Sequence, residues 1–303
     1  MAEIILHQYD TSPFSEKVRL CLGIKGLAWR AVDQPVVMPK PDLVPLTGGY
    51  RRIPVLQIGA DVYCDSALIV REIDRRFAGP PLYPKGCEGF TGTVEFWADK
   101  GLFQAAVIAI FGALGDAVDP AFIKDREALS GQPFNVAAMK AMVPHALSQI
   151  HAHAALLARQ LDDDRPFLAG EVPSLADAAA FYNFWFIRSF SPGVADSFPA
   201  LPQIDAWYDR VSAIGHGQRS AMSRDEALEV ARTCEPEALG VVEGDRGLVG
   251  IPVTLSATDY GRDPIAGVFA GSTAYSMTVL RDDPQLGRIA VHVPRLGYAL
   301  NAG

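Results

Sequence analysis

Cysteine is scarce in this chain, which has four cysteines among 303 residues. None of them belongs to a CxxC pair, and no histidine lies at metal-ligand spacing from any of them. The sequence therefore argues against a disulfide framework and against a cysteine-based zinc site. The six histidines contain no HExxH motif, and His151 and His153 would point to different sides of a helix. We expect reduced thiols and no metal centre.

Basic charge is also in the minority. The 27 Lys and Arg residues are outnumbered by 35 Asp and Glu residues, which gives a net charge of −8. Nucleic acids and anionic membranes both favour a basic surface, so we expect no nucleic-acid partner and no membrane partner. A long uninterrupted apolar run is missing too, because Gln104 and Asp116 interrupt the stretch from Gly101 to Val118. We interpret that stretch as a buried helix rather than a membrane span.

The first residues lack the pattern of a secretory signal, because the apolar run between Glu3 and Asp10 is too short. The protein is therefore expected to be cytoplasmic. The composition, with 49% hydrophobic and 20% charged residues, is that of a folded globular protein. The length favours about two domains.

Residues 1–80 alternate short apolar strands with helices. The order is β-α-β, a loop and then β-β-α, and it ends at the linker Gly79-Pro80-Pro81. This pattern predicts an α/β domain. The expected strands are Ile4–Leu6, Trp29–Val32, Ile53–Ile58 and Val62–Cys64, and the expected helices are Pro13–Ile24 and Ser66–Phe77.

Residues 88–235 contain helical patterns and no convincing strand. Apolar residues recur at helical spacing from Met139 to Leu161, and Pro144 should kink that helix or mark its true start. Ser174 to Asp177 resembles a capping box, and the helix that follows is apolar on nearly all faces. This zone predicts an all-α helical bundle. Its other expected helices are Val94–Leu114, Leu175–Phe190, Ala200–Ile214 and Arg224–Arg232.

Residues 240–303 change in character, with no lysine and many glycines. Apolar and polar residues alternate in Val253–Ala257, as in a half-buried strand. We predict a small β-rich unit, either a meander or a partial barrel. The further strand candidates are Val268–Ala270, Tyr275–Leu280, Ile289–Val293 and Tyr298–Leu300.

Ser12 stands at the start of the first predicted helix, directly before Pro13. A helix N-terminus has free backbone N–H groups and a partial positive charge, so it stabilises anions, including a thiolate. The Ser12 hydroxyl could add a hydrogen bond. Lowering a thiol pKa by two units takes about 2.7 kcal/mol, which these two effects can supply together. The alternative is that Ser12 is an ordinary N-cap.

Two further sites lie in the same domain. Pro54 is at the start of a strand, and a cis Ile53–Pro54 bond would expose the Ile53 backbone for pairing with an extended peptide. Asp65 and Ser66 open the second helix, where a serine with its own N–H suits a carboxylate and an aspartate suits an ammonium group. The alternative is again an ordinary helix cap.

Taken together, these stretches resemble the glutathione transferases. SPFSEKVR at 12–19 is similar to the catalytic loop and helix of the tau and omega classes. RIPVL at 52–56 is similar to the cis-proline strand, and DSALI at 65–69 to the signature that holds the γ-glutamyl group. The resemblance covers residues 3–215. It implies a thioredoxin-like N-terminal domain at 1–80 and an all-α domain at 88–235, usually in a homodimer, with 240–303 as an extension outside the family core.

The resemblance also implies roles for individual residues. Ser12 would be catalytic, and Tyr9 is a weaker catalytic candidate whose alternative is core packing. The loop Thr47–Arg52 departs from the family's asparagine-proline pattern. The implied glutathione-binding residues are Phe14, Arg52 (toward the glycyl carboxylate), Ile53, Pro54, Asp65 and Ser66. Tyr9, Trp97, Phe103 and Phe111 are candidates for an electrophile pocket, with core packing as the alternative.

The main functional prediction is an enzyme that stabilises the thiolate of glutathione and conjugates it to a small apolar electrophile. Glutathione is the implied co-substrate. The alternatives are a non-catalytic protein that binds glutathione or an apolar ligand, and a glutathione-dependent reductase or isomerase. The extension at 240–303 would cover the mouth of the active site, widen a dimer interface or bind a further partner.

Overall fold

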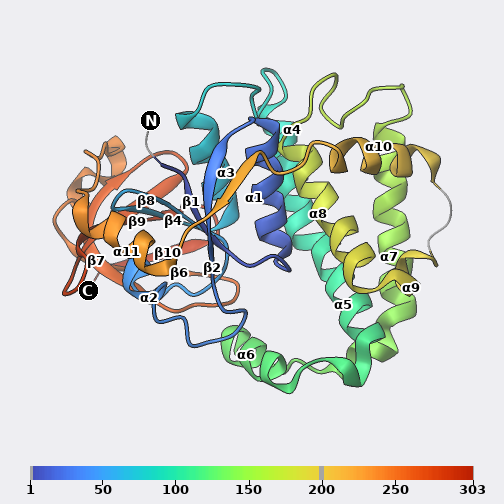
Figure 1. Ribbon diagram of the computed structural model, residues 1–303, viewed down its shortest axis with the longest axis horizontal. Coiled ribbons are helices and arrows are strands. Elements are labelled where there is room, and N and C mark those ends of the chain that lie inside the picture. Colours follow the sequence, from blue (N-terminus) through green and yellow to red (C-terminus); the bar gives the residue numbers. More distant parts are fainter. Residues whose placement is uncertain (1–2, 198–200, 303) are drawn as a thin grey trace.

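The structure is a computed structural model, and it describes residues 3–197 and 201–302. One half of the molecule is built around a β-sheet and the other half is helical (Figure 1). The order of elements in the first domain confirms the predicted α/β arrangement. These elements are β1 (Ile5–Gln8), α1 (Pro13–Ile24), β2 (Ala28–Asp33), α2 (Val44–Thr47), β3 (Val55–Ile58), β4 (Asp61–Cys64) and α3 (Ser66–Arg76).

Strand β1 lies at the centre of this domain. It pairs in parallel with β2 and antiparallel with β3, and β3 forms a hairpin with β4. Helix α1 contacts α3 on one side and the helical half on the other. It is buried along most of its length, which explains why apolar residues such as Val18 and Leu22 recur in it.

The helical half is a bundle, as predicted. Helix α5 packs against α7, and α8 packs against α1 and α4. Its helices are α4 (Glu88–Trp97), α5 (Phe103–Leu114), α6 (Pro120–Ser130), α7 (Val136–Gln160), α8 (Leu175–Phe190), α9 (Pro192–Ala195) and α10 (Pro202–Ser212), with a π-helical turn Ala98–Leu102 and a short 3₁₀ turn Gly115–Ala117. The expected start of α10 at Ala200 falls outside the described residues.

One helical expectation needs correction. Pro144 does not mark a helix start, because α7 begins at Val136 and runs through the proline. Helix α5 packs closely against these first turns, since a Cβ on Gly112 would lie 2.6 Å from the Met139 carbonyl oxygen.

Within the described residues, the helical stretch Glu88–Ala117 is long and apolar enough to cross a membrane by length and composition. In the structure it packs within the bundle, where Ala106 and Ile110 are fully buried. A core helix of a bundle meets the same length criterion, which agrees with our interpretation of this stretch as a buried helix.

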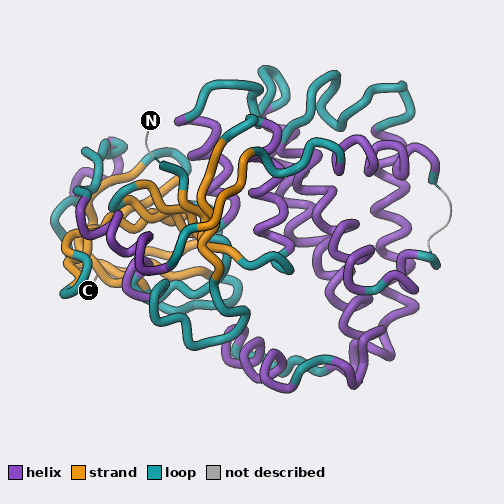
Figure 2. The backbone as a smooth tube through the Cα atoms, viewed as in Figure 1, coloured by secondary structure: helices purple, strands orange, loops and turns teal. Residues whose placement is uncertain are grey.

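The sheet is larger than expected. Within residues 3–197 and 201–302 its ten strands follow the order β10-β6-β7-β8-β9-β4-β3-β1-β2-β5, and Figure 2 shows the strands gathered in one half of the molecule. The C-terminal strands do form a meander from β6 to β9, with β10 back beside β6. These elements are β5 (Gln218–Ala221), α11 (Arg224–Thr233), a 3₁₀ turn (Glu243–Leu248), β6 (Pro252–Ala257), β7 (Ile265–Ser272), β8 (Ser276–Asp283), β9 (Gly287–Pro294) and β10 (Tyr298–Ala302).

The C-terminal extension is continuous with the first domain. Strand β9 pairs in parallel with β4, with Val62 opposite Val291. The two regions also share one apolar core, in which Leu43 and Val62 lie with Val279 and Val291. The predicted β-rich character of the extension is confirmed, and the pairing of β9 with β4 joins it to the sheet of the first domain.

Strand β5 lies in the zone that we expected to be all-helical. It pairs in parallel with β2 at the edge of the sheet, and all four of its residues are exposed. An exposed polar strand has no alternation of apolar residues, so its sequence carries no strand signal. The following helix α11 was expected, and it buries Ala227 and Ala231 against the sheet.

Candidate functional site

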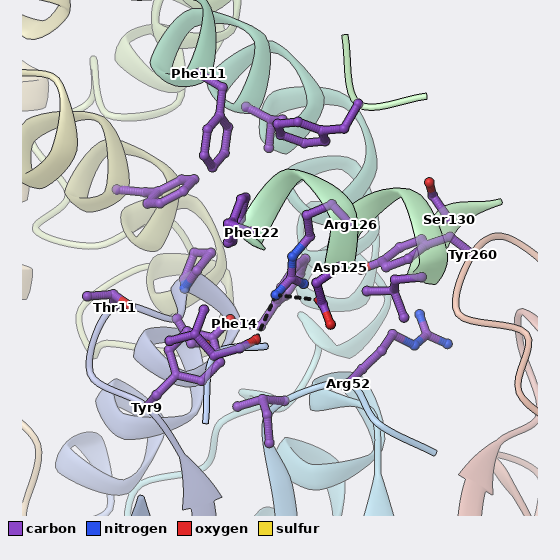
Figure 3. A pocket seen from close by; sticks show the side chains of 18 of the residues that line it. Tyr9, Thr11, Phe14, Arg52, Phe111, Phe122, Asp125, Arg126, Ser130 and Tyr260 are labelled. Atoms are coloured by element: carbon purple, nitrogen blue, oxygen red, sulfur yellow. Dashed lines mark hydrogen bonds and ion pairs between the residues drawn. The ribbon is translucent and has the colours of Figure 1, made fainter. Parts of the chain in front are cut away.

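A cavity of about 380 Å³ lies between the sheet half and the helical half. We call one side the polar wall and the other the aromatic wall (Figure 3). The polar wall includes Tyr9, Ser12, Lys40, Arg51, Arg52, Asp125 and Arg126. The aromatic wall includes Phe14, Phe103, Phe111, Phe122, Phe134, Phe186 and Phe190. A pocket with one charged side and one apolar side suits a ligand that is itself divided in this way.

Ser12 is the N-cap of α1 and also lines the cavity. Its Oγ accepts the backbone N–H of Ser15 at 3.2 Å, and the residue is only 1% exposed. The cap uses an oxygen lone pair and leaves the hydroxyl hydrogen available to an acceptor. The N-cap alternative and the anion-stabilising role are therefore compatible in this geometry.

Tyr9 lies beside Ser12, and the two hydroxyl groups share a hydrogen bond. The Tyr9 hydroxyl is also hydrogen-bonded to the guanidinium of Arg126, as Figure 3 shows. Burial raises the pKa of Tyr9 above its usual value. The phenol therefore stays protonated at neutral pH and can donate a hydrogen bond.

Arg126 comes from α6 in the helical half, and the sequence analysis missed it. Its Nη2 donates to the Val36 carbonyl at 2.9 Å and lies 3.4 Å from Asp125. Its guanidinium lies 4.6 Å from the centre of the Phe122 ring. No local motif marks this arginine, because only the folding of α6 over the 34–41 loop brings it to Tyr9.

Lys40 and Arg51 add positive charge to the polar wall. The Lys40 Nζ donates to the Arg51 carbonyl at 3.0 Å. Burial, together with the nearby charges of Arg126 and Arg51, lowers the pKa of Lys40 to about 8, although Asp125 opposes this shift. Arg51 is paired with Asp263 of the extension at 3.2 Å. The sequence analysis assigned no role to either residue.

Ile53 lines the cavity, and the Ile53–Pro54 peptide bond is cis. Pro54 is buried directly before β3. Phe14 also lines the cavity, and its ring lies 4.7 Å from that of Phe103. The sequence-predicted residues Tyr9, Ser12, Phe14, Ile53 and Phe103 thus come together in one place.

Asp65 and Ser66 lie beyond the polar wall and are not among the lining residues. Asp65 is the N-cap of α3, with a positive φ of 78°, and it accepts the Ala67 N–H at 3.1 Å. Its other oxygen accepts the Tyr298 hydroxyl of β10 at 3.3 Å. The extension therefore contacts the residue that the resemblance assigns to the γ-glutamyl group.

Arg52 lies between the cavity and Asp65, enclosed by tyrosines. Its Nη2 donates to the Tyr298 hydroxyl at 3.0 Å, and its Nη1 lies 3.4 Å from Asp259. Its guanidinium is 4.8 Å from the ring centre of Tyr260, which also lines the cavity. The extension thus contributes Tyr260 to the wall of the cavity.

Trp97 does not line the cavity, in contrast to the sequence expectation. Its indole Nε1 donates to Nδ1 of His153 at 3.1 Å, so it packs inside the bundle. Phe111 does line the cavity, with the rings of Phe122 and Phe134 at 5.3 and 5.1 Å. In the described part of the chain, no group of three or more His, Cys, Asp or Glu residues is placed to hold a metal ion.

The chain matches two family models. The model for the glutathione S-transferase N-terminal domain matches residues 6–81, and the model for the C-terminal domain matches residues 137–210. A probable glutathione S-transferase of Nicotiana tabacum is 27% identical over 240 residues, which covers 77% of this chain and 94% of that protein.

Solved structures extend the comparison. A GST-like protein from Pseudomonas syringae has a TM-score of 0.81 and 34% identity, with all of both chains covered. A tau class glutathione S-transferase from mango (Mangifera indica) has a TM-score of 0.52 and 17% identity, over 76% of this chain and 97% of that one, and this likeness concerns the fold alone. The full coverage of the Pseudomonas structure includes the extension. The chain belongs to the glutathione S-transferase family.

Proposed function

We propose that the protein is a glutathione transferase that activates the thiol of glutathione at Ser12 and conjugates it to an apolar aromatic electrophile. One observation carries the proposal: the Ser12 hydroxyl, at the N-terminus of α1, lies on a cavity whose other side is the aromatic wall. The nucleophile and the apolar reactant would thus meet in one enclosed space.

The physical requirements of this reaction are modest. Lowering the thiol pKa by two units takes about 2.7 kcal/mol. A hydrogen bond from Ser12 and the partial positive charge of the helix terminus act together on a thiolate. Ile53, at the edge of the cavity, supports a role in pairing with the peptide backbone, and Lys40 and Arg51 offer positive charge to a carboxylate.

Asp65 and Ser66 would hold the γ-glutamyl group, as the resemblance implies. Because Tyr298 already donates to Asp65, we expect Tyr298 either to share this carboxylate with the ammonium group or to move. Because the same contact already occupies Asp65, it favours a second candidate function, in which the protein binds an apolar ligand in the cavity without turnover.

Calorimetric titration with reduced glutathione and with S-methylglutathione tests the proposal, together with conjugation assays on Ser12→Ala. We expect Ser12→Ala to bind S-methylglutathione nearly as well as the wild type and to lose about 10²-fold in conjugation rate. Ser223→Ala, which removes the exposed N-cap of α11, is the matched control. Glutathione binding without any turnover in the wild type, or no glutathione binding at all, would disprove the transferase function. The second function then predicts that an apolar ligand binds in the cavity without glutathione.

A further inference from the structure

Arg52 and Asp65 carry opposite charges that are separated by a single hydroxyl group. The Arg52 Nη2 donates to the Tyr298 hydroxyl oxygen at 3.0 Å, and the same hydroxyl donates to Oδ2 of Asp65 at 3.3 Å. These directions are fixed, because a guanidinium only donates and an ionised carboxylate only accepts. Tyr298, from strand β10 of the extension, therefore separates a cation from an anion that attract each other strongly at a partly buried site.

Asp259, also from the extension, holds Arg52 from another side. Its Oδ1 accepts from the Arg52 Nη1 at 3.4 Å, and its Oδ2 accepts from the Lys100 Nζ of the helical half at 2.6 Å. The Tyr260 backbone N–H also donates to Oδ1, at 2.8 Å, so three donors fix this carboxylate. Figure 3 shows the Arg52 side chain beside Tyr260. Arg52 thus has a carboxylate partner other than Asp65.

The surroundings of Arg52 limit its contact with a ligand. Both terminal nitrogens have an oxygen partner in the extension, and the side chain is only 10% exposed. Three tyrosine rings enclose the guanidinium, with ring centres at 5.3, 4.8 and 5.7 Å (Tyr50, Tyr260 and Tyr298). Lys40 and Arg51 remain as the cations for a ligand carboxylate, and Arg52 is available for a different role.

Asp65 keeps the capacity for a further partner. It is half-buried, its Oδ1 accepts the Ala67 N–H at 3.1 Å, and its Oδ2 accepts the Tyr298 hydroxyl. Each carboxylate oxygen has two lone pairs, so each retains one. Both donors are neutral, so neither cancels the negative charge. A direct ion pair with Arg52 would cancel that charge and weaken the attraction for a ligand ammonium group.

We infer that the extension is part of the thiol-peptide site: Tyr298 and Asp259 hold Arg52 away from Asp65 and thereby keep this carboxylate for the α-ammonium of the γ-glutamyl group. The inference rests on the proposed transferase function. It adds two positioning residues, both outside residues 6–81 and 137–210, which the family models match. Tyr298 shares the carboxylate with the ammonium group. Selection of the amino end of the peptide then depends on both ends of the chain.

Two peptides isolate the contact with the ammonium group. One is S-methylglutathione, and the other is its glutaryl analogue, in which hydrogen replaces the α-amino group. We expect the wild type to bind S-methylglutathione at least about tenfold more tightly in calorimetric titrations, because the analogue lacks the charged group that bonds to Asp65.

Tyr298→Phe removes the hydroxyl and lets Arg52 pair directly with Asp65. We expect this variant to bind S-methylglutathione about tenfold more weakly and the glutaryl analogue less than about threefold more weakly. Tyr275→Phe, at a position of the extension that is 56% exposed, is the matched control and should bind both peptides like the wild type.

Asp259→Asn removes the negative charge that holds Arg52 from the other side. It should act in the same direction as Tyr298→Phe but more weakly, with a loss of about threefold for S-methylglutathione. The matched control is Asp282→Asn, which removes an exposed carboxylate of the extension.

A double variant supplies a readout that a purely structural role would not give. Adding Arg52→Met to Tyr298→Phe removes the competing cation, so the affinity for S-methylglutathione should return to within about threefold of the wild-type value. If the two changes merely damaged the site, their losses would add. Arg52→Gln replaces Arg52→Met if the latter does not fold.

No loss in Tyr298→Phe, equal losses for both peptides, or no recovery in the double variant would overturn the inference and leave the transferase function intact. Equal affinity of the wild type for the two peptides would do the same. A wild type that binds neither peptide would disprove the proposed function itself and, with it, this inference.

Discussion

Lys40 is a buried cation whose charge changes close to neutral pH, since burial and its arginine neighbours lower its pKa to about 8. Below this pH the ammonium is charged and attracts a carboxylate, and above it the attraction is lost. We therefore expect the affinity for S-methylglutathione to fall about tenfold as the pH rises from about 7 to about 9. Calorimetry of the wild type measures this change.

Lys40→Met is the reference for this measurement. The amino group of S-methylglutathione itself titrates in both proteins, so the difference between the two pH profiles reports on Lys40 alone. The variant should bind more weakly at pH 7 and show a shallower pH dependence. Identical pH profiles for the wild type and the variant would show that Lys40 does not contact the ligand.

At the residue scale, the sequence predicted those cavity-lining residues whose positions follow from a nearby helix or strand. Ser12 and Ile53 line the cavity because each lies at the start of an element of the first domain. Arg126 and Lys40 could not be predicted, since neither belongs to a motif and both reach the cavity through contacts between distant segments. The sequence left Trp97 between a core role and a pocket role, because an aromatic residue on a helix has the same pattern in both.

Asp177 is the residue that fixes the start of α8. It is fully buried and accepts the N–H groups of Leu168 at 2.8 Å and Ser174 at 2.9 Å, as well as the Trp207 indole N–H at 2.9 Å. Asp177→Ala would leave these buried donors without a partner, so we expect a loss of at least about 3 kcal/mol in the free energy of unfolding. Urea denaturation measures the loss.

The second capping box offers a matched control. Glu226 completes the capping box of α11 but is exposed. Water can therefore accept the Ser223 N–H when the Glu226 side chain is removed. Glu226→Ala should therefore cost less than about 1 kcal/mol. Similar losses in the free energy of unfolding for Asp177→Ala and Glu226→Ala would contradict the claim that burial makes the Asp177 hydrogen bonds more important.

At the element scale, caps and apolar spacing made the helices predictable. Helix α8 begins at Leu175 as expected, since both its capping box and its apolar faces are visible in the sequence. Strand β5 could not be predicted, because its exposed residues carry no alternation and its structure comes from pairing with β2. The pairing of β9 with β4 was missed for a similar reason, because the local sequence of a strand does not show which distant strand it pairs with.

At the scale of the whole molecule, the extension and the first domain should unfold together. Val291 of β9 is fully buried in their shared core, so Val291→Asp would place a charge there. We expect one cooperative transition in the wild type and a loss of at least about 3 kcal/mol in this variant, measured by thermal denaturation. Leu296→Asp, at a position that is 84% exposed, should have little effect. A separate transition for the extension would contradict this expectation.

The homodimer that the family implies stays a prediction. The structure limits where the dimer interface can lie, because strand β4 already has a neighbour on each side. These neighbours are β9 and β3. A partner subunit therefore cannot add a strand beside β4.

The strand order also determines when, during translation, the sheet can be completed. On the ribosome, β4 emerges long before β9, its neighbour in the finished sheet. Until residue 294 has been made, the edge of β4 and the apolar side chains beneath it have no cover, and an open edge readily pairs with other chains. The first domain can therefore be completed only after β9 has been translated, so nascent chains should depend on chaperones more than a chain that closes its sheet early.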